Sequence, residues 1–208
     1  MLASQLDTPP RYLVMPCLQG TTLESQLRTH GPFDVPTALC IVRQAAEALD
    51  ALFTAGYVHS DLKPENILVT EEGHTTVIDL GFARRLDEVS SAATRRIMGT
   101  CNYLAPEQVL AAWEADIRSD FYSLGVVLYR MLTGQLPYRA RDLKELVEQF
   151  RDRPVPSVRS FAPHVPAKVA RFVARLLAKD PLRRPQTPQA LIDELAALEI
   201  ETFTYRPW

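Results

Sequence analysis

The sequence is poor in cysteine and in long apolar stretches, and each shortage excludes a class of protein. Its three cysteines, Cys17, Cys40 and Cys101, form no CxxC pair, so neither a zinc site nor a disulfide framework is indicated. This pattern fits a reducing compartment, and we expect a cytoplasmic protein. The mostly apolar run 121–132 contains polar residues and is too short for a membrane span. The start of the chain does not have the pattern of a signal peptide.

Neither sign of charge dominates the chain. Its 23 Lys and Arg residues and 25 Asp and Glu residues give a net charge of −2. No overall basic field is therefore available to hold nucleic acid or an anionic membrane. Hydrophobic residues make up 47% of the 208 residues, which is typical of one globular domain with a sizeable core.

The spacing of apolar residues predicts a mainly α-helical domain with a small β-hairpin. Apolar residues recur at helical spacing between Asp34 and Gly56, and 119–133 is apolar nearly all round, as in a central helix. The β-rich runs 67–70 and 75–79 enclose a polar turn and predict the hairpin. Other predicted elements are a strand in 12–18, helices at 21–30, 143–150, 165–177 and 191–198, and a long loop at 81–105.

One segment has charged and amide residues in an order that points to chemistry. His59-Ser60-Asp61-Leu62-Lys63-Pro64-Glu65-Asn66 resembles the catalytic loop of eukaryotic-type (Hanks-type) serine/threonine protein kinases. Asp79-Leu80-Gly81 is similar to the metal-binding triplet of that family. Three further segments resemble the end of its activation segment, the start of its central helix and its last block: 99–107, 120–125 and 180–185. The ordered set of motifs, more than any one of them, makes the resemblance specific.

The resemblance implies the carboxy-terminal lobe of a kinase, with a hinge, over residues 12–198. Residues 1–11 and 199–208 would be tails. The catalytic loop would be 59–66 and the activation segment 79–107. The implied reaction is phosphoryl transfer from ATP to Ser or Thr hydroxyls of protein substrates.

Four residues would carry that reaction. Phosphoryl transfer depends mainly on positioning and on neutralising charge. Asp61 would orient the attacking hydroxyl, and Lys63 would bring a positive charge to the transferring group. Asn66 and Asp79 would hold Mg²⁺, since hard cations prefer oxygen ligands. Asp61 and Lys63 alone would be interpreted as solvated charges, and it is Asn66 and Asp79 that favour the functional interpretation.

The resemblance places the nucleotide next to residues 15–18. The carbonyl of Pro16 would accept from the adenine amino group, the N–H of Leu18 would donate to the ring, and Leu68 would pack beneath it. No Gly-rich loop, strand lysine or helix glutamate precedes this hinge in the sequence given. The expectation is therefore a kinase domain without its amino-terminal lobe, and a second chain is one source of that lobe.

Some residues are expected to be structural. By resemblance, His59 packs beneath the metal-binding triplet, and Asp120 accepts backbone hydrogen bonds from the catalytic loop. Glu107 and Arg184 would form a buried ion pair.

The sequence departs from the family pattern in three respects, which concern regulation, the metal-binding triplet and substrate choice. Ser60 replaces the arginine that normally receives a phosphate on the activation segment, although hydroxyls remain there at Ser90, Ser91 and Thr94. Leu80 replaces the usual phenylalanine of the triplet. In addition, Thr22 and Arg130 occupy places where basophilic kinases have acidic residues, which leaves Glu65 as the one obvious acidic contact. No strong preference for substrate arginines is expected.

Three interpretations remain open at this stage. The chain is part of an active kinase, a non-catalytic lobe that serves as a scaffold or protein-binding module, or the product of a decayed gene. The intact set Asp61, Lys63, Asn66 and Asp79 favours the first, and the missing nucleotide cover favours the other two.

Overall fold

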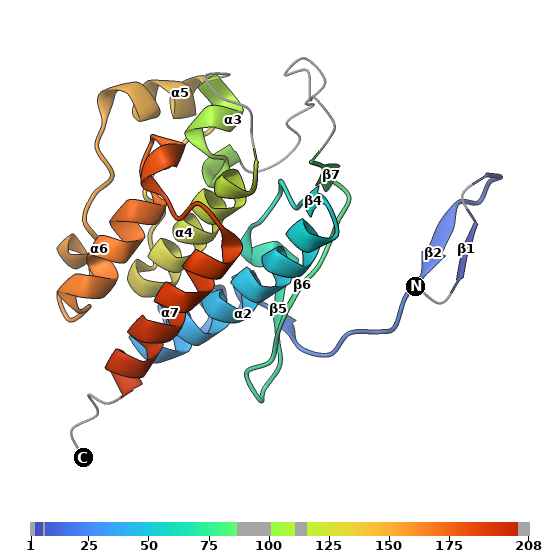
Figure 1. The fold of residues 1–208 in the computed structure, drawn as a ribbon, viewed down its shortest axis with the longest axis horizontal. Coiled ribbons are helices and arrows are strands. Elements are labelled where there is room, and N and C mark those ends of the chain that lie inside the picture. Colours follow the sequence, from blue (N-terminus) through green and yellow to red (C-terminus); the bar gives the residue numbers. More distant parts are fainter. Residues whose placement is uncertain (1–2, 6, 87–100, 111–115, 204–208) are drawn as a thin grey trace.

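A hairpin projects from a helical body in the computed structural model, which describes residues 3–5, 7–86, 101–110 and 116–203 (Figure 1). Strand β1 (Ala3–Gln5) pairs antiparallel with β2 (Tyr12–Val14), and an extended segment joins the pair to the body. The strand predicted in 12–18 is thus present, in shorter form. The expected tail 1–11 contains β1, which its sequence did not indicate.

The body is built around α4 (Ile117–Thr133), in which every residue except Arg118 and Arg130 is buried. This confirms the predicted central helix. Helix α6 (Ala167–Leu176) packs so closely on it that a Cβ at Gly125 would lie 2.7 Å from the Cβ of Leu176. Glycine is therefore required at this point of α4.

Helix α2 (Val35–Thr54) lies between α4 and α7 (Pro188–Phe203), and Figure 1 shows α2 and α7 side by side. Asp34 caps α2 by accepting the Thr37 N–H at 2.9 Å, as expected for an aspartate in that position. Helix α7 continues to Phe203, so the expected tail 199–208 begins inside a helix.

Shorter helices complete the body. They are α1 (Leu23–His30), α3 (Pro106–Leu110), α5 (Leu143–Asp152) and the 3₁₀ turns η1 (Pro64–Asn66), η3 (Cys101–Tyr103), η4 (Val158–Ser160) and η5 (Pro181–Arg183). The predicted helices at 21–30, 143–150, 165–177 and 191–198 are all confirmed, with bounds shifted by a few residues. No helix in the described ranges has the length and apolar character to cross a membrane.

Two small antiparallel sheets flank the helices. In one, β5 (Ile67–Val69) lies between β3 (Thr21–Thr22) and β6 (Thr75–Val77), which confirms the predicted hairpin. In the other, β4 (Tyr57–Val58) pairs with β7 (Arg84–Arg85). β7 lies in the stretch 81–105 that was expected to be a loop. The predicted fold class, mainly α with a small β-hairpin, is confirmed.

Candidate active site

The two sheets bring together the segments that the sequence analysis singled out. Strand β4 leads into the loop 59–66, and β5 follows it. Strand β6 leads into Asp79, and β7 comes shortly after. The Ile78 N–H donates to the Asn66 carbonyl at 2.9 Å, which extends the β5–β6 pairing to the end of the loop. The loop and the triplet 79–81 are therefore held side by side.

Asp61, Lys63 and Asn66 form one hydrogen-bonded cluster. The Asp61 Oδ2 accepts from Lys63 Nζ at 2.7 Å and from Asn66 Nδ2 at 3.1 Å. Nδ2 of Asn66 also donates to the Asp61 carbonyl at 2.8 Å. Because both hydrogen bonds use Nδ2, the Oδ1 atom of Asn66 is left for a ligand. The side chains of Asp61 and Lys63 are 24% and 22% exposed, so the charged atoms remain open to a reactant. The structure thus brings together three of the four residues predicted to carry chemistry.

Asp79 lies at the surface at the start of the triplet, with a left-handed φ of 66°. Its Oδ1 accepts the Gly81 N–H at 3.1 Å. A carboxylate and an amide oxygen suit Mg²⁺, which commonly takes one or two protein oxygens together with phosphates and water. Within the described ranges no three His, Cys, Asp or Glu residues gather as a metal site. The two protein oxygens suit a Mg²⁺ ion whose other ligands are phosphates and water.

His59 connects the loop to the strand before Asp79. The ring is fully buried, its Nδ1 lies 3.3 Å from the Asp61 N–H, and its Nε2 lies 3.2 Å from the Ile78 carbonyl. Nδ1 must accept and Nε2 must donate, which defines the neutral Nε2–H tautomer. His59 was expected beneath the metal-binding triplet, and in the structure its ring contacts Ile78, the residue directly before that triplet.

Asp120, in the first turn of α4, holds the start of the loop. Its carboxylate is buried and accepts the N–H groups of His59 and Ser60, both at 2.8 Å, as the sequence analysis expected. Burial raises the pKa of Asp120, while the two N–H groups that it accepts and the charge of Arg84 oppose the rise. Ser60 has a left-handed φ of 67°, which is unfavourable for a non-glycine residue.

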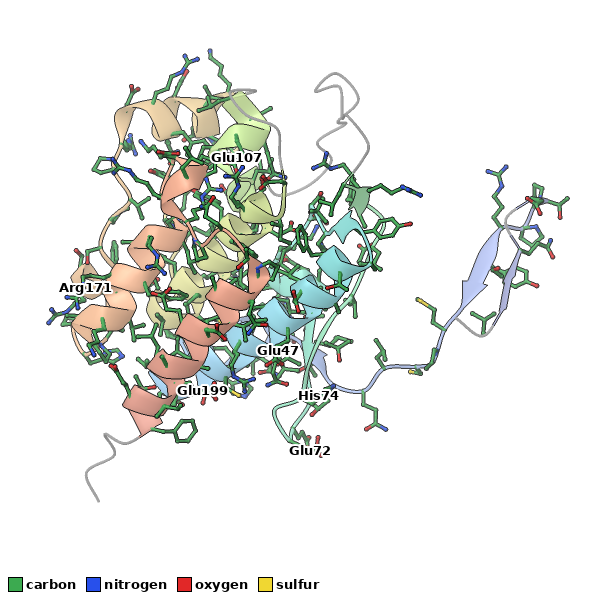
Figure 2. The ribbon with its side chains drawn as sticks, in the orientation of Figure 1. Glu47, Glu72, His74, Glu107, Arg171 and Glu199 are labelled. Atoms are coloured by element: carbon green, nitrogen blue, oxygen red, sulfur yellow. The ribbon has the colours of Figure 1, made fainter. Side chains whose placement is uncertain are left out.

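The predicted ion pair of Glu107 and Arg184 ties α3 to the end of the helical body. Two hydrogen bonds of 2.5 and 2.8 Å join the side chains, which are 2% and 0% exposed. Ser119 also donates to Glu107, at 2.8 Å. Glu107 points into the body beneath α3 (Figure 2). A pair as buried as this fixes α3 against the helical body.

The three predicted adenine contacts are not brought together. Pro16 and Leu18 lie in the extended segment that leads to the hairpin, and Leu18 is 50% exposed. Leu68 lies on β5, half-buried, opposite Thr22 of β3. The residues described here make no hydrogen bond to Pro16 or Leu18.

A charged cluster that the sequence did not reveal lies next to the loop. Arg130 of α4 binds Glu24 of α1 through two hydrogen bonds, of 2.5 and 2.9 Å, and donates to the Tyr103 hydroxyl at 2.5 Å. These residues and Glu65 line a hollow of about 260 Å³. The sequence analysis expected Glu65 to be the one obvious acidic contact for a substrate. That expectation was wrong, because Glu24 lines the same hollow. Glu24 was missed because nothing in its local pattern indicates a partner 106 residues away.

Glu65 has a buried oxygen in this hollow. Its Oε2 accepts no hydrogen bond from any residue that the structure describes. Burial raises the pKa of Tyr103, and the neighbouring Arg130 opposes that rise. The hollow therefore contains both signs of charge: Arg130 is paired with Glu24, and Arg139 also lines the hollow.

The similarity of this chain to known proteins extends over most of its length. The family model described as "Protein kinase domain" matches residues 3–195. A probable serine/threonine-protein kinase of Clostridium perfringens is 33% identical over 90% of this chain and 27% of its own length. The probable kinase pknA2 of Bifidobacterium longum is 34% identical over 94% of this chain and 26% of its own length. PknL of Mycobacterium tuberculosis is 35% identical over 91% and 47%, respectively. The chain thus spans about a quarter to a half of the length of these relatives.

Proposed function

We propose that this chain, which belongs to the protein kinase family, carries the phosphoryl-transfer site of a serine/threonine kinase. The family generally uses ATP and magnesium and acts on proteins. The observation that carries the proposal is the cluster of Asp61, Lys63 and Asn66, held beside the strand that leads to Asp79. These residues belong to two of the ordered segments that together make the resemblance to kinases specific.

Asp61 is the residue that would receive the substrate hydroxyl. Its carboxylate is oriented by Asn66 and paired with Lys63, so it can accept a hydrogen bond from the attacking Ser or Thr. Lys63 lies 2.7 Å from that carboxylate and would place its charge beside the group being transferred. Asn66 Oδ1 and the Asp79 carboxylate would hold Mg²⁺, whose charge offsets that of the phosphates when bound.

The nucleotide would lie on the side of the body where β5 and the triplet meet. We propose that the carbonyl of Pro16 and the N–H of Leu18 bind adenine after the segment 15–18 moves against Leu68. The exposed fractions of Leu18 and Leu80, 50% and 53%, support a cover over this side. Residues outside 1–208, in the same polypeptide or in a second chain, would provide that cover.

The domain boundaries proposed from the sequence are retained, with the kinase domain at 12–198, the catalytic loop at 59–66 and the activation segment at 79–107. Of the last, residues 87–100, with Ser90, Ser91 and Thr94, lie outside the described ranges. A cytoplasmic location remains a prediction from the cysteine pattern alone.

A scaffold lobe is the second candidate function. It is favoured by the exposed apolar side chains near the triplet, Leu80 and Phe82, which are 53% and 52% exposed and would suit a protein partner as well as a nucleotide cover. A scaffold has no need for Asp61, so dependence on Asp61 distinguishes the two.

A transfer assay tests the proposal. Residues 1–208 would be incubated with radiolabelled ATP, Mg²⁺ and casein, alone and together with the separately produced amino-terminal lobe of a related kinase. We expect no measurable transfer by the chain alone, and transfer by the mixture that Asp61→Asn abolishes without changing thermal unfolding. A mixture that binds ATP but transfers nothing would favour the scaffold. Full transfer by the Asp61→Asn variant would remove the role given to Asp61.

A further inference from the structure

Ser60 stands directly before Asp61 and needs support from outside the loop. Its φ of 67° is unfavourable for any residue with a Cβ. Its N–H donates to Asp120, whose buried carboxylate also accepts the His59 N–H. Serine has no charge of its own to offset that carboxylate. A strained residue beside a buried anion persists only where surrounding groups hold it in place.

Arg84 of β7 provides such a group. Its Nε donates to the Ser60 Oγ at 3.2 Å, and its guanidinium is close enough to Asp120 to lower the pKa of that carboxyl against the effect of burial. The side chain is half-buried, so its charge is less screened than on an open surface. Arg84 thus contacts the residue before Asp61 and acts on the anion behind it.

The pairing of β7 with β4 fixes where Arg84 stands. Val58 lies opposite Arg84 in the antiparallel register, two residues before Ser60, and the Leu86 N–H donates to the Gly56 carbonyl at 2.9 Å. Diagonal neighbours on paired strands are within reach of long side chains. The same strand follows the triplet 79–81 after a short turn. Arg84 therefore links the metal-binding side of the site to the loop that carries Asp61.

We propose that Arg84 is a positioning residue for phosphoryl transfer, because it holds Ser60 in its left-handed conformation and offsets the charge of Asp120, and so fixes the backbone that carries Asp61. The effect on transfer rests on the proposed function. The effect on the conformation of the loop does not depend on it, and can be measured on residues 1–208 without catalysis.

Amide hydrogen exchange, resolved for the N–H groups of His59 and Ser60, is the first arm of the test. Arg84→Ala should make both exchange at least about tenfold faster, since their acceptor and their backbone geometry lose support. Arg85→Ala removes the same charge from the next residue, whose side chain points to the other face of the strand, and should change exchange less than about twofold. Equal effects of the two variants, or none from Arg84→Ala, would overturn the proposal.

A double-mutant cycle with Ser60→Ala isolates the contact itself. This variant removes the acceptor without altering β7, and should also speed exchange of the two N–H groups. If the contact couples the residues, Arg84→Ala should add much less in the Ser60→Ala background than in the original chain. Full additivity would overturn the proposal. Should Arg84→Ala fail to fold, unchanged exchange in Ser60→Ala would overturn it by itself.

Transfer kinetics with the complementing lobe form the last arm. Arg84→Ala should lower kcat about tenfold or more with KM for ATP changed less than about twofold, because Asp61 is displaced while the nucleotide contacts remain. Arg85→Ala should change neither. An unchanged kcat in Arg84→Ala would contradict a positioning role. Faster exchange combined with no transfer by the mixture of the original chain and the complementing lobe would reject the proposed function and leave the structural link between Arg84 and Ser60 standing.

Discussion

Arg130 and Glu24 neutralise each other at the place where basophilic kinases are expected to bind substrate arginines. Two hydrogen bonds join them, and Arg130 also binds the Tyr103 hydroxyl. A substrate arginine brought to this hollow would meet a cation that is already paired. We predict that the reconstituted kinase shows no strong preference for arginine upstream of the target hydroxyl, and a peptide array would measure it. A strict basic motif would contradict this.

Reversing the charge at Arg130 should create the missing preference. Arg130→Glu would gather three carboxylates, with Glu24 and Glu65, in one hollow. We expect kcat/KM for a peptide with an upstream arginine to rise about tenfold relative to its alanine counterpart, because the charges become complementary. Arg141→Glu makes the same change on a residue whose side chain is 92% exposed and that does not line the hollow, and should leave the ratio unchanged.

The pair of Glu107 and Arg184 gives a prediction about stability. Replacing Arg184 with Met leaves the Glu107 carboxylate buried without its cation, and should lower the free energy of unfolding by about 3–5 kcal/mol. Urea denaturation would measure it. Lys168→Met removes a pair whose side chains are 60% and 52% exposed, and should cost about 1 kcal/mol or less. Equal losses from the two variants would contradict the buried pair.

At the scale of elements, β7 brings a cation to the loop 59–66. The Nε of Arg84 already donates to Ser60, so the loop has a cation without any phosphate. We predict that alanine at Ser90, Ser91 and Thr94 together leaves most activity of the reconstituted enzyme. Transfer rates of the triple variant would check this. A loss of a hundredfold or more, about 2.7 kcal/mol of barrier, would show that a phosphate in this segment is needed.

Helices were predictable from the sequence, and the shortest strands were not. Helices α2 and α4 have apolar residues at regular spacing over many turns, which fixes their type and position. Strands β1 and β7 have three and two residues, too few for any period, and exist because a partner strand lies beside them. Pairing of this kind is a property of the folded chain and leaves no local pattern.

The same distinction applies to the candidate site. Asp61, Lys63 and Asn66 lie within six residues, so the motif gave both their identity and their proximity. Contacts that cross the fold had no such signal. Arg84 reaches Ser60 across 24 residues and Glu24 reaches Arg130 across 106, and each depends on how separate elements pack.

At the scale of the whole molecule, exposed apolar residues near the proposed nucleotide side predict self-association. Met15, Leu80 and Phe82 are 68%, 53% and 52% exposed. We expect purified residues 1–208 to form oligomers as concentration rises, and Leu80→Glu with Phe82→Glu to reduce them. Sedimentation velocity would measure both. Ile200→Glu, at a 68% exposed residue of α7, is the control and should have little effect. A chain that stays monomeric throughout would contradict the prediction.

The central claim is that Asn66 and Asp79 hold a metal–phosphate group beside Asp61, and paramagnetic NMR with Mn²⁺ and ATP tests it most directly. Mn²⁺ takes the same oxygen ligands as Mg²⁺, and broadening is detectable even when binding is weak. The account predicts that the amide signals of residues 61, 66 and 79–81 broaden most. Asp79→Asn should suppress the effect, whereas Glu72→Gln, in the exposed hairpin turn labelled in Figure 2, should not. Broadening centred on that turn, or unchanged in Asp79→Asn, would contradict the claim.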